Sequence, residues 1–286
     1  MERDYLKFMQ EKMPELSKSH KAIASYIIDH PDTAAYFTAT KLGNAAGVSE
    51  STVVRFANEL GFKGFPEMQK ALSNQLRSRM NSVQRVAAAT SIMDGADILS
   101  KIMTRDMERI KSTLDEVDRD AFYKTVEMLT NAKHIYIIGM RSASMLASFF
   151  AYNLNIILNN VTLLDMTSKS DMFERLMWIS ECDVFVGISF PRYSKRTRNA
   201  MEFAGGRGAK ILAITDSESS PIAANCDCAL FAKSDMAAFA DTLVAPLSII
   251  NALIAAVSMN KRQQLSEHLS ELEKIWDEYD VYEKTN

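Results

Sequence analysis

The chain has 286 residues, of which 47% are hydrophobic and 24% are charged, and its formal net charge at pH 7 is −3. At roughly 100–200 residues per domain this length favours two domains, and ten glycines and six prolines exclude a fibrous or low-complexity protein. No membrane span is expected, because spans need roughly 18 apolar residues and the longest candidate, residues 243–259, is interrupted by polar side chains.

The N-terminal part of the chain has a helical pattern throughout, without strand-like alternation. Its first ten residues, MERDYLKFMQ, are charged and amphipathic and have no signal-peptide core, so we expect a cytoplasmic protein. Ser17 can cap a helix that Pro31 then stops. Two further helices are predicted over residues 40–46 and 49–60, and Gly61 closes the second.

Residues 38–62, TATKLGNAAGVSESTVVRFANELGF, have the pattern of a helix, a tight turn and a second helix. Gly47 allows the turn, and Val48 can fill the angle between the helices. Ser49 can cap the second helix, with Glu50 near the positive end of its dipole. This order is typical of a helix-turn-helix DNA-binding module, although an ordinary helical hairpin gives the same pattern.

The second helix of this pattern has an apolar and a polar side. Ser51, Thr52 and Arg55 are expected to face outward on its first two turns, where a recognition helix meets base edges and phosphates. Lys63, in the turn GFKGF that follows, suits a contact with the DNA backbone. The inward face is expected to include Val53, Val54, Phe56, Ala57 and Leu60. The residues predicted to bind double-stranded operator DNA are Ser49, Ser51, Thr52, Arg55 and Lys63.

The charge distribution favours a DNA-binding module attached to an acidic protein. Residues 41–85 hold seven basic and three acidic side chains, whereas the tail from residue 263 onward is acidic. Two more helices are predicted between residues 94 and 130. We therefore predict an all-α helix-turn-helix domain over residues 1–79, a polar, Ala-rich linker over 80–93 and an effector-binding domain over 94–286.

After Lys133 the pattern changes to short apolar runs, each followed by a segment of helix length. The runs are HIYIIG, VTLLD, DVFVGIS, KILAITD and CALFA. Continuous apolar strands are what a parallel sheet buried on both faces requires. The alternation with helices predicts an α/β three-layer sandwich with a five-stranded parallel sheet, in which a ligand binds at the carboxyl ends of the strands.

Hydroxyl-bearing and cationic residues follow the first and third of these strands. The segment GMRSASMLA brings them to the start of a helix, where free backbone N–H groups and the helix dipole can hold an anion. The segment ISFPRYSKRTRNA does the same after the third strand. Both loops together indicate an anionic ligand between neighbouring strands, although capping serines and solvated cations explain each loop alone. The predicted effector-binding residues are Arg141, Ser142, Ser144, Ser189, Arg192, Tyr193, Ser194 and Thr197.

The chain resembles a transcriptional regulator of the RpiR family, with an N-terminal helix-turn-helix domain and a C-terminal SIS (sugar isomerase) domain. The resemblance covers residues 17–261 and is carried by AAGVSESTVVRFANELGFKGF, IYIIGMRSASMLA and VFVGISFPRYSKRTRNAMEFAGGRGAKILAITDSESSPIA. It implies control of metabolic operons by a phosphosugar or related metabolite bound in the SIS domain. By position, the resemblance implies that the hydroxyls of Ser142, Ser144, Ser189 and Ser194 hold the phosphate.

One departure from the family pattern concerns the loop after the third strand. The SIS pattern there is usually Ser-x-Ser-Gly-x-Thr, whereas residues 189–194 read SFPRYS. Pro191 replaces a phosphate-binding hydroxyl, and Arg192 replaces the glycine. A guanidinium can hold either a phosphate or a carboxylate through two hydrogen bonds, so we expect a phosphosugar or a sugar acid as effector.

The alternative function is that of a sugar-phosphate isomerase or lyase with the same fold. Isomerisation needs a general base, often assisted by histidine. None of the histidines, which are His20, His30, His134 and His268, falls at the carboxyl end of a predicted strand. Asp235 and Asp241 lie near strand ends, and Asp165 and Asp216 are interpreted as caps. No base and histidine come together, so we predict a sensor without catalytic activity or cofactor.

The remaining features concern cysteines and assembly. Cys182, Cys226 and Cys228 have no histidine nearby, so we predict buried free thiols and no metal site. The stretch MAAFADTLVAPLSIINALIAAV predicts an apolar helix buried in a core or an interface. Since helix-turn-helix proteins commonly bind two-fold operators as dimers, we expect a homodimer through the SIS domain, or a tetramer built from it.

Overall fold

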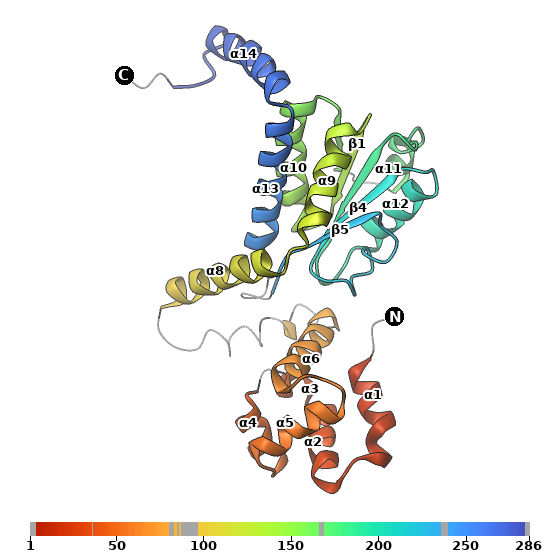
Figure 1. Cartoon of the computed structure of the whole chain (residues 1–286), viewed down its shortest axis with the longest axis vertical. Helices are drawn as coiled ribbons and strands as arrows, with labels where there is room; N and C mark the ends of the chain where they lie inside the picture. The colour runs from red at the N-terminus through yellow and green to blue at the C-terminus, as the bar shows by residue number, and fades with distance from the viewer. Residues whose placement is uncertain are drawn as a thin grey trace. The chain divides into compact units, whose positions relative to one another are not determined.

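The computed structural model describes residues 4–35, 37–79, 83–84, 86, 97–165, 169–235 and 240–283. Contacts divide the chain into two compact units, of which the first contains helices α1 to α6 and the second contains the strands and helices α8 to α14 (Figure 1). Most of the predicted linker, namely residues 80–82, 85 and 87–93, lies outside the described residues, and the domain boundaries stay a prediction.

The N-terminal unit is all-helical. Ser17 accepts a hydrogen bond from the His20 N–H and starts α2, as predicted, while Pro31 starts a short helix, α3, that was not predicted. Buried Ile23, Phe56 and Met68 lie in one core cluster. The helices are α1 (Tyr5–Lys12), α2 (Lys18–Asp29), α3 (Pro31–Ala34), α4 (Ala39–Ala46), α5 (Glu50–Glu59) and α6 (Phe65–Arg79), with a 3₁₀ turn, η1 (Met13–Glu15).

The C-terminal unit is built on a five-stranded parallel sheet, as predicted. Its strands, β1 (Ile135–Gly139), β2 (Val161–Leu163), β3 (Val184–Ile188), β4 (Lys210–Thr215) and β5 (Cys228–Phe231), have the order β2-β1-β3-β4-β5. From β1 the chain therefore goes to β2 on one side and later to β3 on the other. Such a reversal leaves a crevice outside the carboxyl ends of β1 and β3.

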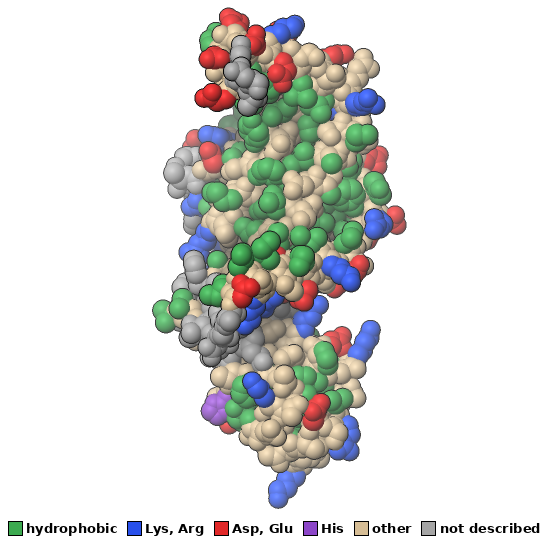
Figure 2. Space-filling model, turned by 90° about the vertical axis from the view of Figure 1, so that its left-hand side faces the viewer, with side chains coloured by type: hydrophobic (Ala, Val, Ile, Leu, Met, Phe, Trp, Pro, Cys, Tyr) green, Lys and Arg blue, Asp and Glu red, His purple; other side chains and the backbone are tan. Residues whose placement is uncertain are grey.

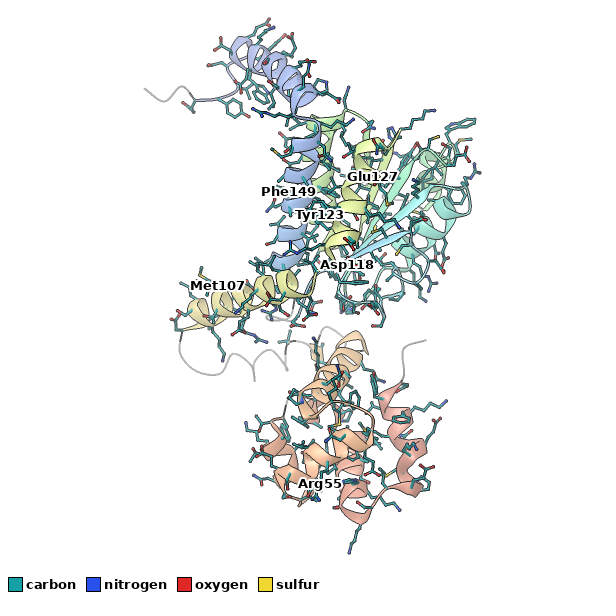
Figure 3. All side chains as sticks on the ribbon, viewed as in Figure 1. Arg55, Met107, Asp118, Tyr123, Glu127 and Phe149 are labelled. Atoms are coloured by element: carbon teal, nitrogen blue, oxygen red, sulfur yellow. The ribbon has the colours of Figure 1, made fainter. Side chains whose placement is uncertain are left out.

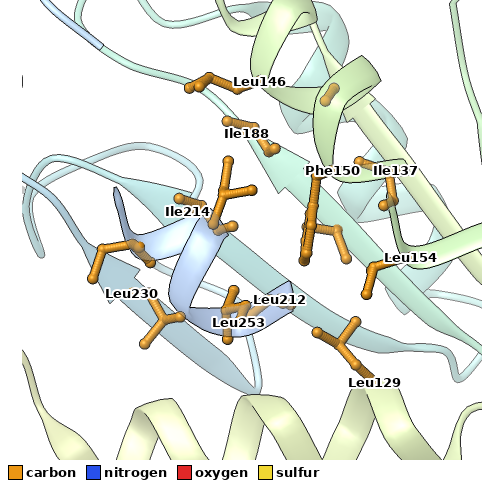
Figure 4. Packing of buried hydrophobic residues seen from close by; sticks show 14 of the residues in the cluster. Leu129, Ile137, Leu146, Phe150, Leu154, Ile188, Leu212, Ile214, Leu230 and Leu253 are labelled. Atoms are coloured by element: carbon orange, nitrogen blue, oxygen red, sulfur yellow. The ribbon is translucent and has the colours of Figure 1, made fainter. Parts of the chain in front are cut away.

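Helices cover both faces of this sheet, which confirms the three-layer architecture. One core cluster joins α9 (Arg119–Asn131), α10 (Ala143–Leu158) and α13 (Val244–Asn260) to one face of the sheet. Figure 4 shows Phe150 and Leu154 of α10 packed with Ile137, Leu212 and other strand residues. A second cluster joins α11 (Lys169–Arg175) and α12 (Lys195–Gly205) to the opposite face.

The apolar helix predicted near residues 243–259 is α13, and it lies in the core. Its residues Ile250, Leu253 and Val257 are fully buried. The following helix, α14 (Arg262–Glu278), is bent from α13 by 96°. Among the described residues no single helix is long and apolar enough to cross a membrane. The bent pair of α13 and α14 has the length and composition of a membrane span only when the two helices are counted together.

A polar network fixes α8 (Ile98–Glu116) to the segment that follows β5. Arg109 is 5% exposed; its Nη1 lies 3.4 Å from Asp106 Oδ1 and its Nε 3.7 Å from Asp235 Oδ2. The Thr242 hydroxyl donates to Asp106 Oδ1 over 2.9 Å, and the Thr242 N–H donates to the Asp235 carbonyl over 3.0 Å. The Lys233 N–H also donates to the Thr113 hydroxyl over 2.9 Å. The C-terminal half of α8 is thereby attached at the carboxyl edge of the sheet.

The cysteines differ in part from the prediction of buried thiols. Cys228 is buried and donates to the Ala121 carbonyl, and burial raises the pKa of the half-buried Cys226. Cys182 is exposed, so the prediction was wrong for this residue. Its place in the turn between α11 and β3 explains the exposure.

Candidate DNA-binding and ligand-binding sites

The predicted turn between two helices is formed by α4 and α5. Gly47 ends α4 with φ of 69°, a conformation that glycine adopts without strain. Ser49 caps α5 by accepting a hydrogen bond from the Thr52 N–H over 3.3 Å. The two helices approach closely, since a Cβ on Gly43 would lie 2.8 Å from the Val48 carbonyl oxygen. The chain therefore holds α4 and α5 in a fixed mutual orientation.

The residues on the outward face of α5 differ in part from those predicted. Ser51 and Arg55 are exposed, as expected, and Figure 3 marks Arg55 on this unit. Thr52 is only 8% exposed, and its hydroxyl lies 2.8 Å from Ser49 Oγ within the cap, so the prediction that it faces outward was wrong. Val54, expected inside, is 37% exposed, and Asn58 is exposed one turn further on.

These four exposed residues form a continuous stripe. Ser51, Val54, Arg55 and Asn58 are spaced at i, i+3, i+4 and i+7, which places them on one side of an α-helix. Sequence reasoning missed Val54 and Asn58, although this spacing could have identified them. Lys63 is exposed as expected, but its backbone N–H donates to Glu67 Oε2 over 2.5 Å, which leaves only its side chain for a phosphate.

The two predicted ligand-binding loops leave neighbouring strands at the same level. Gly139 at the end of β1 is paired with Ile188 at the end of β3. Adjacent strands lie about 4.8 Å apart, so residues 140–144 and 189–197 start side by side at the crevice where the strand order reverses. The prediction that the two strands are neighbours is confirmed.

Each of these loops contains an arginine in the left-handed backbone region. Arg141 has φ of 58° and Arg192 has φ of 62°. This conformation costs a residue with a Cβ about 1–2 kcal/mol, and such strain clusters at functional sites. It also explains why the SIS pattern has glycine at the position of Arg192. Both arginines are exposed at the carboxyl edge of the sheet.

The turn after β1 is more closed than predicted. The N–H groups of Ala143, Ser144 and Met145 donate to the carbonyls of Met140, Arg141 and Ser142 over 3.2, 3.0 and 3.3 Å. The expectation of free N–H groups was wrong for these three residues, because a tight turn satisfies them at the start of α10. The Ser144 hydroxyl donates to the Arg141 carbonyl over 2.6 Å, whereas the exposed Ser142 makes no side-chain cap.

The loop after β3 is held by its own polar side chains. Ser189 Oγ accepts from the Ser194 N–H over 3.0 Å, and Ser194 Oγ caps α12 by accepting from the Thr197 N–H. The Tyr193 hydroxyl donates over 2.9 Å to Asp216 Oδ1, just beyond β4. Asp216, interpreted as a cap, thus supports this loop, and its role as a cap stays a prediction. These contacts hold the segment that carries Arg192.

Two of the predicted ligand residues lie beneath this loop. Ser189 is 3% exposed, and Thr197 is fully buried with a hydroxyl that has no hydrogen-bond partner. Contact of either side chain with a ligand requires the loop to shift, so their binding role stays a prediction. The exposed or half-buried candidates around the loops are Arg141, Ser142, Ser144, Arg192, Tyr193 and Ser194.

The titratable groups that an isomerase would need lie apart from one another. His134 precedes β1 at the amino edge of the sheet, where burial lowers its pKa and its Nε2 lies 2.8 Å from Thr162 Oγ1. His268 of α14 contacts the Ile156 carbonyl, and His20 pairs with Glu59 in the N-terminal unit. At the carboxyl edge, Asp235 pairs with Arg109.

Two cavities lie away from the arginine loops. One of about 490 Å³ lies at the amino edge of the sheet and includes Lys124, Glu127, Asp183 and Lys210. Within it, Lys124 Nζ donates to the Asp227 carbonyl and Asp183 accepts from Ser180, so both groups support local structure. The other cavity, of about 280 Å³, is mainly apolar and lies between α8, α9 and α13.

Comparison with known proteins agrees with both halves of this description. Residues 3–79 match the helix-turn-helix domain of the rpiR family, and residues 128–256 match the SIS domain. The chain is 30% identical to the HTH-type transcriptional regulator YfhH of Escherichia coli K12, over 72% of this chain and 73% of that protein. It is 26% identical to the HTH-type transcriptional regulator HexR of Pseudomonas aeruginosa, over 95% of both chains. The fold matches NanR of Vibrio vulnificus, solved with ManNAc-6P, with a TM-score of 0.60, 20% identity, and coverage of 96% and 99%.

Proposed function

The chain belongs to the rpiR family of helix-turn-helix transcriptional regulators with a SIS domain, and we propose that a small anionic metabolite controls its binding to operator DNA. The metabolite is a phosphosugar or a sugar acid. It is held between the loops after β1 and β3, and α5 is the recognition helix. The protein acts as a homodimer through its SIS domain.

This proposal rests on two arginines with a left-handed backbone that lie at the same crevice, where β1 and β3 end. Arg141 and Arg192 come from loops that leave paired positions on β1 and β3. Two guanidinium groups beside the hydroxyls of Ser142 and Ser194 suit a phosphate or carboxylate, which accepts several charge-assisted hydrogen bonds. The ligand named for the similar NanR structure is a sugar phosphate, which supports the same ligand class here.

The exposed stripe of α5 supports operator recognition. Arginine and asparagine are the side chains that pair with guanine and adenine in the major groove, and an apolar side chain such as Val54 suits the thymine methyl group. Arg55, Val54 and Asn58 present these three chemistries on one side of the helix.

The surface of the SIS domain supports the homodimer. Met145, Phe149 and Tyr152 of α10 are exposed, as are Tyr123 of α9 and Met259 of α13. Figure 2 shows hydrophobic side chains gathered over one face of this unit. Large exposed apolar patches mark association surfaces, and a two-fold axis lets one face meet its own copy.

The binding proposal is tested by thermal denaturation of the full-length protein with phosphosugars, sugar acids and the matching neutral sugars. A ligand at 100 times its dissociation constant that binds only the folded state adds about 2.7 kcal/mol of stability. We expect one phosphorylated or acidic sugar to raise the melting temperature while its neutral counterpart does not. Equal shifts with neutral sugars, or no shift with any compound, would contradict an anionic effector.

We also expect the protein to turn over none of these sugars, which separates a sensor from an isomerase. The basis is the separation of the histidines from the carboxylates at the carboxyl edge. Aldose and ketose phosphates incubated with the protein should keep their NMR spectra. Steady isomerisation above background that Asp235→Asn or Asp241→Asn abolishes would establish catalysis and contradict the sensor.

A further inference from the structure

The mainly apolar cavity of about 280 Å³ lies within the C-terminal unit, between α8, α9 and the first half of α13. Figure 1 shows α8 beside the end of α13 at which that helix begins. Among the lining residues Ala245 is fully buried, and Thr113 and Ile249 are 4% and 8% exposed, so the cavity reaches below the surface. None of the described residues that line it belongs to the loops after β1 and β3. The cavity is therefore separate from the crevice proposed for the anionic sugar.

The lining favours a ligand with an apolar body. Its wall consists mainly of hydrophobic side chains from three helices, which are Ile110, Leu114, Val117, Phe122 and Ile249. The Thr113 hydroxyl accepts a hydrogen bond from the Lys233 N–H over 2.9 Å. The Ser248 hydroxyl donates to the Val244 carbonyl over 2.9 Å. Because both hydroxyls are already bound to the backbone, a sugar placed here would lose hydrogen bonds to water and replace few of them.

The volume of the cavity sets the size of this apolar body. A cavity of about 150 Å³ with an apolar lining takes up benzene, which has six carbon atoms. In proportion, about 280 Å³ holds roughly eleven atoms of the size of carbon. An alkyl chain of medium length and a pair of fused aromatic rings both have this size.

The charge at the cavity comes from Arg119, the first residue of α9. Among the described residues that line the cavity, Arg119 alone is charged, and it makes no ion pair within the described part of the chain. The neighbouring Asp118 accepts hydrogen bonds from the N–H groups of Asp120 and Ala121 in the helix cap. Asp115 and Asp120 are exposed and do not line the cavity. A free guanidinium beside an apolar cavity suits an anion that buries its hydrocarbon part and keeps its charge in water.

We propose that this cavity binds an apolar monocarboxylate. Its hydrocarbon body lies between α8, α9 and α13, and its carboxylate lies beside Arg119. Medium-chain fatty acids and aromatic acids share this chemistry. The site goes beyond the proposed function, since it uses none of the residues assigned to the anionic sugar or to DNA.

Calorimetric titration of the full-length protein tests the class of ligand. Octanoate and naphthalene-2-carboxylate represent the alkyl and the aromatic source, and octanamide and naphthalene-2-carboxamide are their neutral counterparts of similar shape. We expect one carboxylate to bind per chain, about two- to fivefold more tightly than its amide, because an exposed ion pair contributes little more. The carboxylate that binds more tightly identifies the source.

A charge variant shows whether Arg119 meets the carboxylate. Arg119→Gln should abolish the preference for the carboxylate over its amide and leave the affinity for the amide unchanged. Lys111→Gln removes an exposed charge of α8 outside the cavity and should keep the preference. The amide is thus an internal control for any change in the shape of the cavity.

Filling the cavity tests its location. Ser248→Leu places a larger side chain in the cavity and should weaken octanoate binding at least about tenfold. Ser258→Leu, the same exchange further along α13 and outside the cavity, should leave it unchanged. If Ser248→Leu does not fold, Ala252→Leu at an exposed lining position and Ala255→Leu outside the lining form a second matched pair.

The length of the alkyl chain separates this cavity from a nonspecific apolar surface. From hexanoate to octanoate to decanoate, each pair of methylene groups should tighten binding roughly tenfold. Tetradecanoate should gain much less, because its chain is longer than the cavity. Affinity that keeps increasing with chain length and is insensitive to the filling variants would show adventitious binding only and overturn the site.

The remaining outcomes also decide the proposal. No binding of either carboxylate, or equal affinity for carboxylate and amide in the wild-type protein, would overturn it. Octanoate that dissociates a dimer in sedimentation velocity would assign the cavity to a subunit contact and overturn it as well. None of these results affects the crevice at Arg141 and Arg192, which is tested separately with anionic sugars.

Discussion

Replacing Arg192 by alanine is expected to raise the dissociation constant of the anionic effector by roughly 10- to 150-fold at about 1.4 kcal/mol per decade. The reason is a lost charge-assisted contact, which contributes about 1.5–3 kcal/mol when an ionised group is paired in a partly enclosed crevice. The loop contacts described above, from Ser189 to Ser194 and from Tyr193 to Asp216, hold Arg192 at the edge of the sheet. Calorimetric titration with the ligand found by thermal denaturation measures the effect.

Because Arg192 has a left-handed backbone, a glycine variant separates the loss of the guanidinium from any loss of stability. Arg192→Gly removes the guanidinium and also relieves a strain of about 1–2 kcal/mol, because glycine adopts this conformation freely. We expect Arg192→Gly to bind the effector as weakly as Arg192→Ala does. Its melting temperature should be higher than that of Arg192→Ala, because alanine keeps the strained backbone. Arg192→Lys should recover only part of the affinity, since a lysine lacks the planar fork.

A matched control lies on the adjoining helix. Arg198 is exposed and pairs with Glu202 over 3.4 Å within α12, so Arg198→Ala should leave effector affinity unchanged. Wild-type affinity in both Arg192→Ala and Arg192→Gly would mean that the arginine is not a ligand residue. A change of oligomeric state without a change of affinity would assign it to a subunit contact.

Replacing Arg55 by alanine is expected to weaken operator binding by about 1–3 kcal/mol, which is roughly 5- to 150-fold. Arg55 is exposed in the second turn of α5, where recognition helices reach base edges. The operator is first obtained by selection from random duplexes, and gel shifts then compare the selected and a scrambled duplex at several salt concentrations. Lys21→Ala, an exposed change on α2, is the control for loss of general positive charge.

The salt dependence separates two roles of Arg55. If it reads a base, the loss falls on the selected duplex and the preference over scrambled DNA decreases. If it contacts only phosphate, both duplexes lose affinity alike and the salt slope becomes shallower. Unchanged affinity for both duplexes would contradict the assignment of α5 as the recognition helix.

The sheet could be predicted from the sequence because its signal is local. Runs such as IYIIG and VFVGI are apolar at every position, as strands covered on both faces must be, and each became a strand of the parallel sheet. The caps of α2 and α5 could also be predicted from the sequence, since Ser17 and Ser49 directly precede the helices that they cap. Short α3 has too few residues for a periodic pattern and was missed.

The details of the candidate sites depend on contacts that the sequence does not display. Tyr193 and Asp216 are 23 residues apart and meet only because β3 and β4 are neighbours. The left-handed backbone of Arg141 has no signal in the sequence, since arginine rarely adopts it, whereas at Arg192 the glycine of the SIS pattern is such a signal. The polar hydroxyl of Thr52 predicts an outward position, whereas the structure turns this hydroxyl toward Ser49 within the cap of α5.

Helix α8 is attached at Arg109, so a tilt of the helix about this residue moves its N-terminal end. Ile98, where α8 begins, is eleven residues from Arg109, about 16 Å at 1.5 Å per residue. A tilt of about 5° at Arg109 therefore displaces Ile98 by about 1.4 Å. Arg109 pairs with Asp235, and Asp106 of the same helix accepts a hydrogen bond from the Thr242 hydroxyl; Asp235 and Thr242 belong to the segment that leaves β5 at the carboxyl edge of the sheet. A rearrangement of that segment that tilts α8 would therefore also displace the end of α8 from which the chain leads back to residues 1–79.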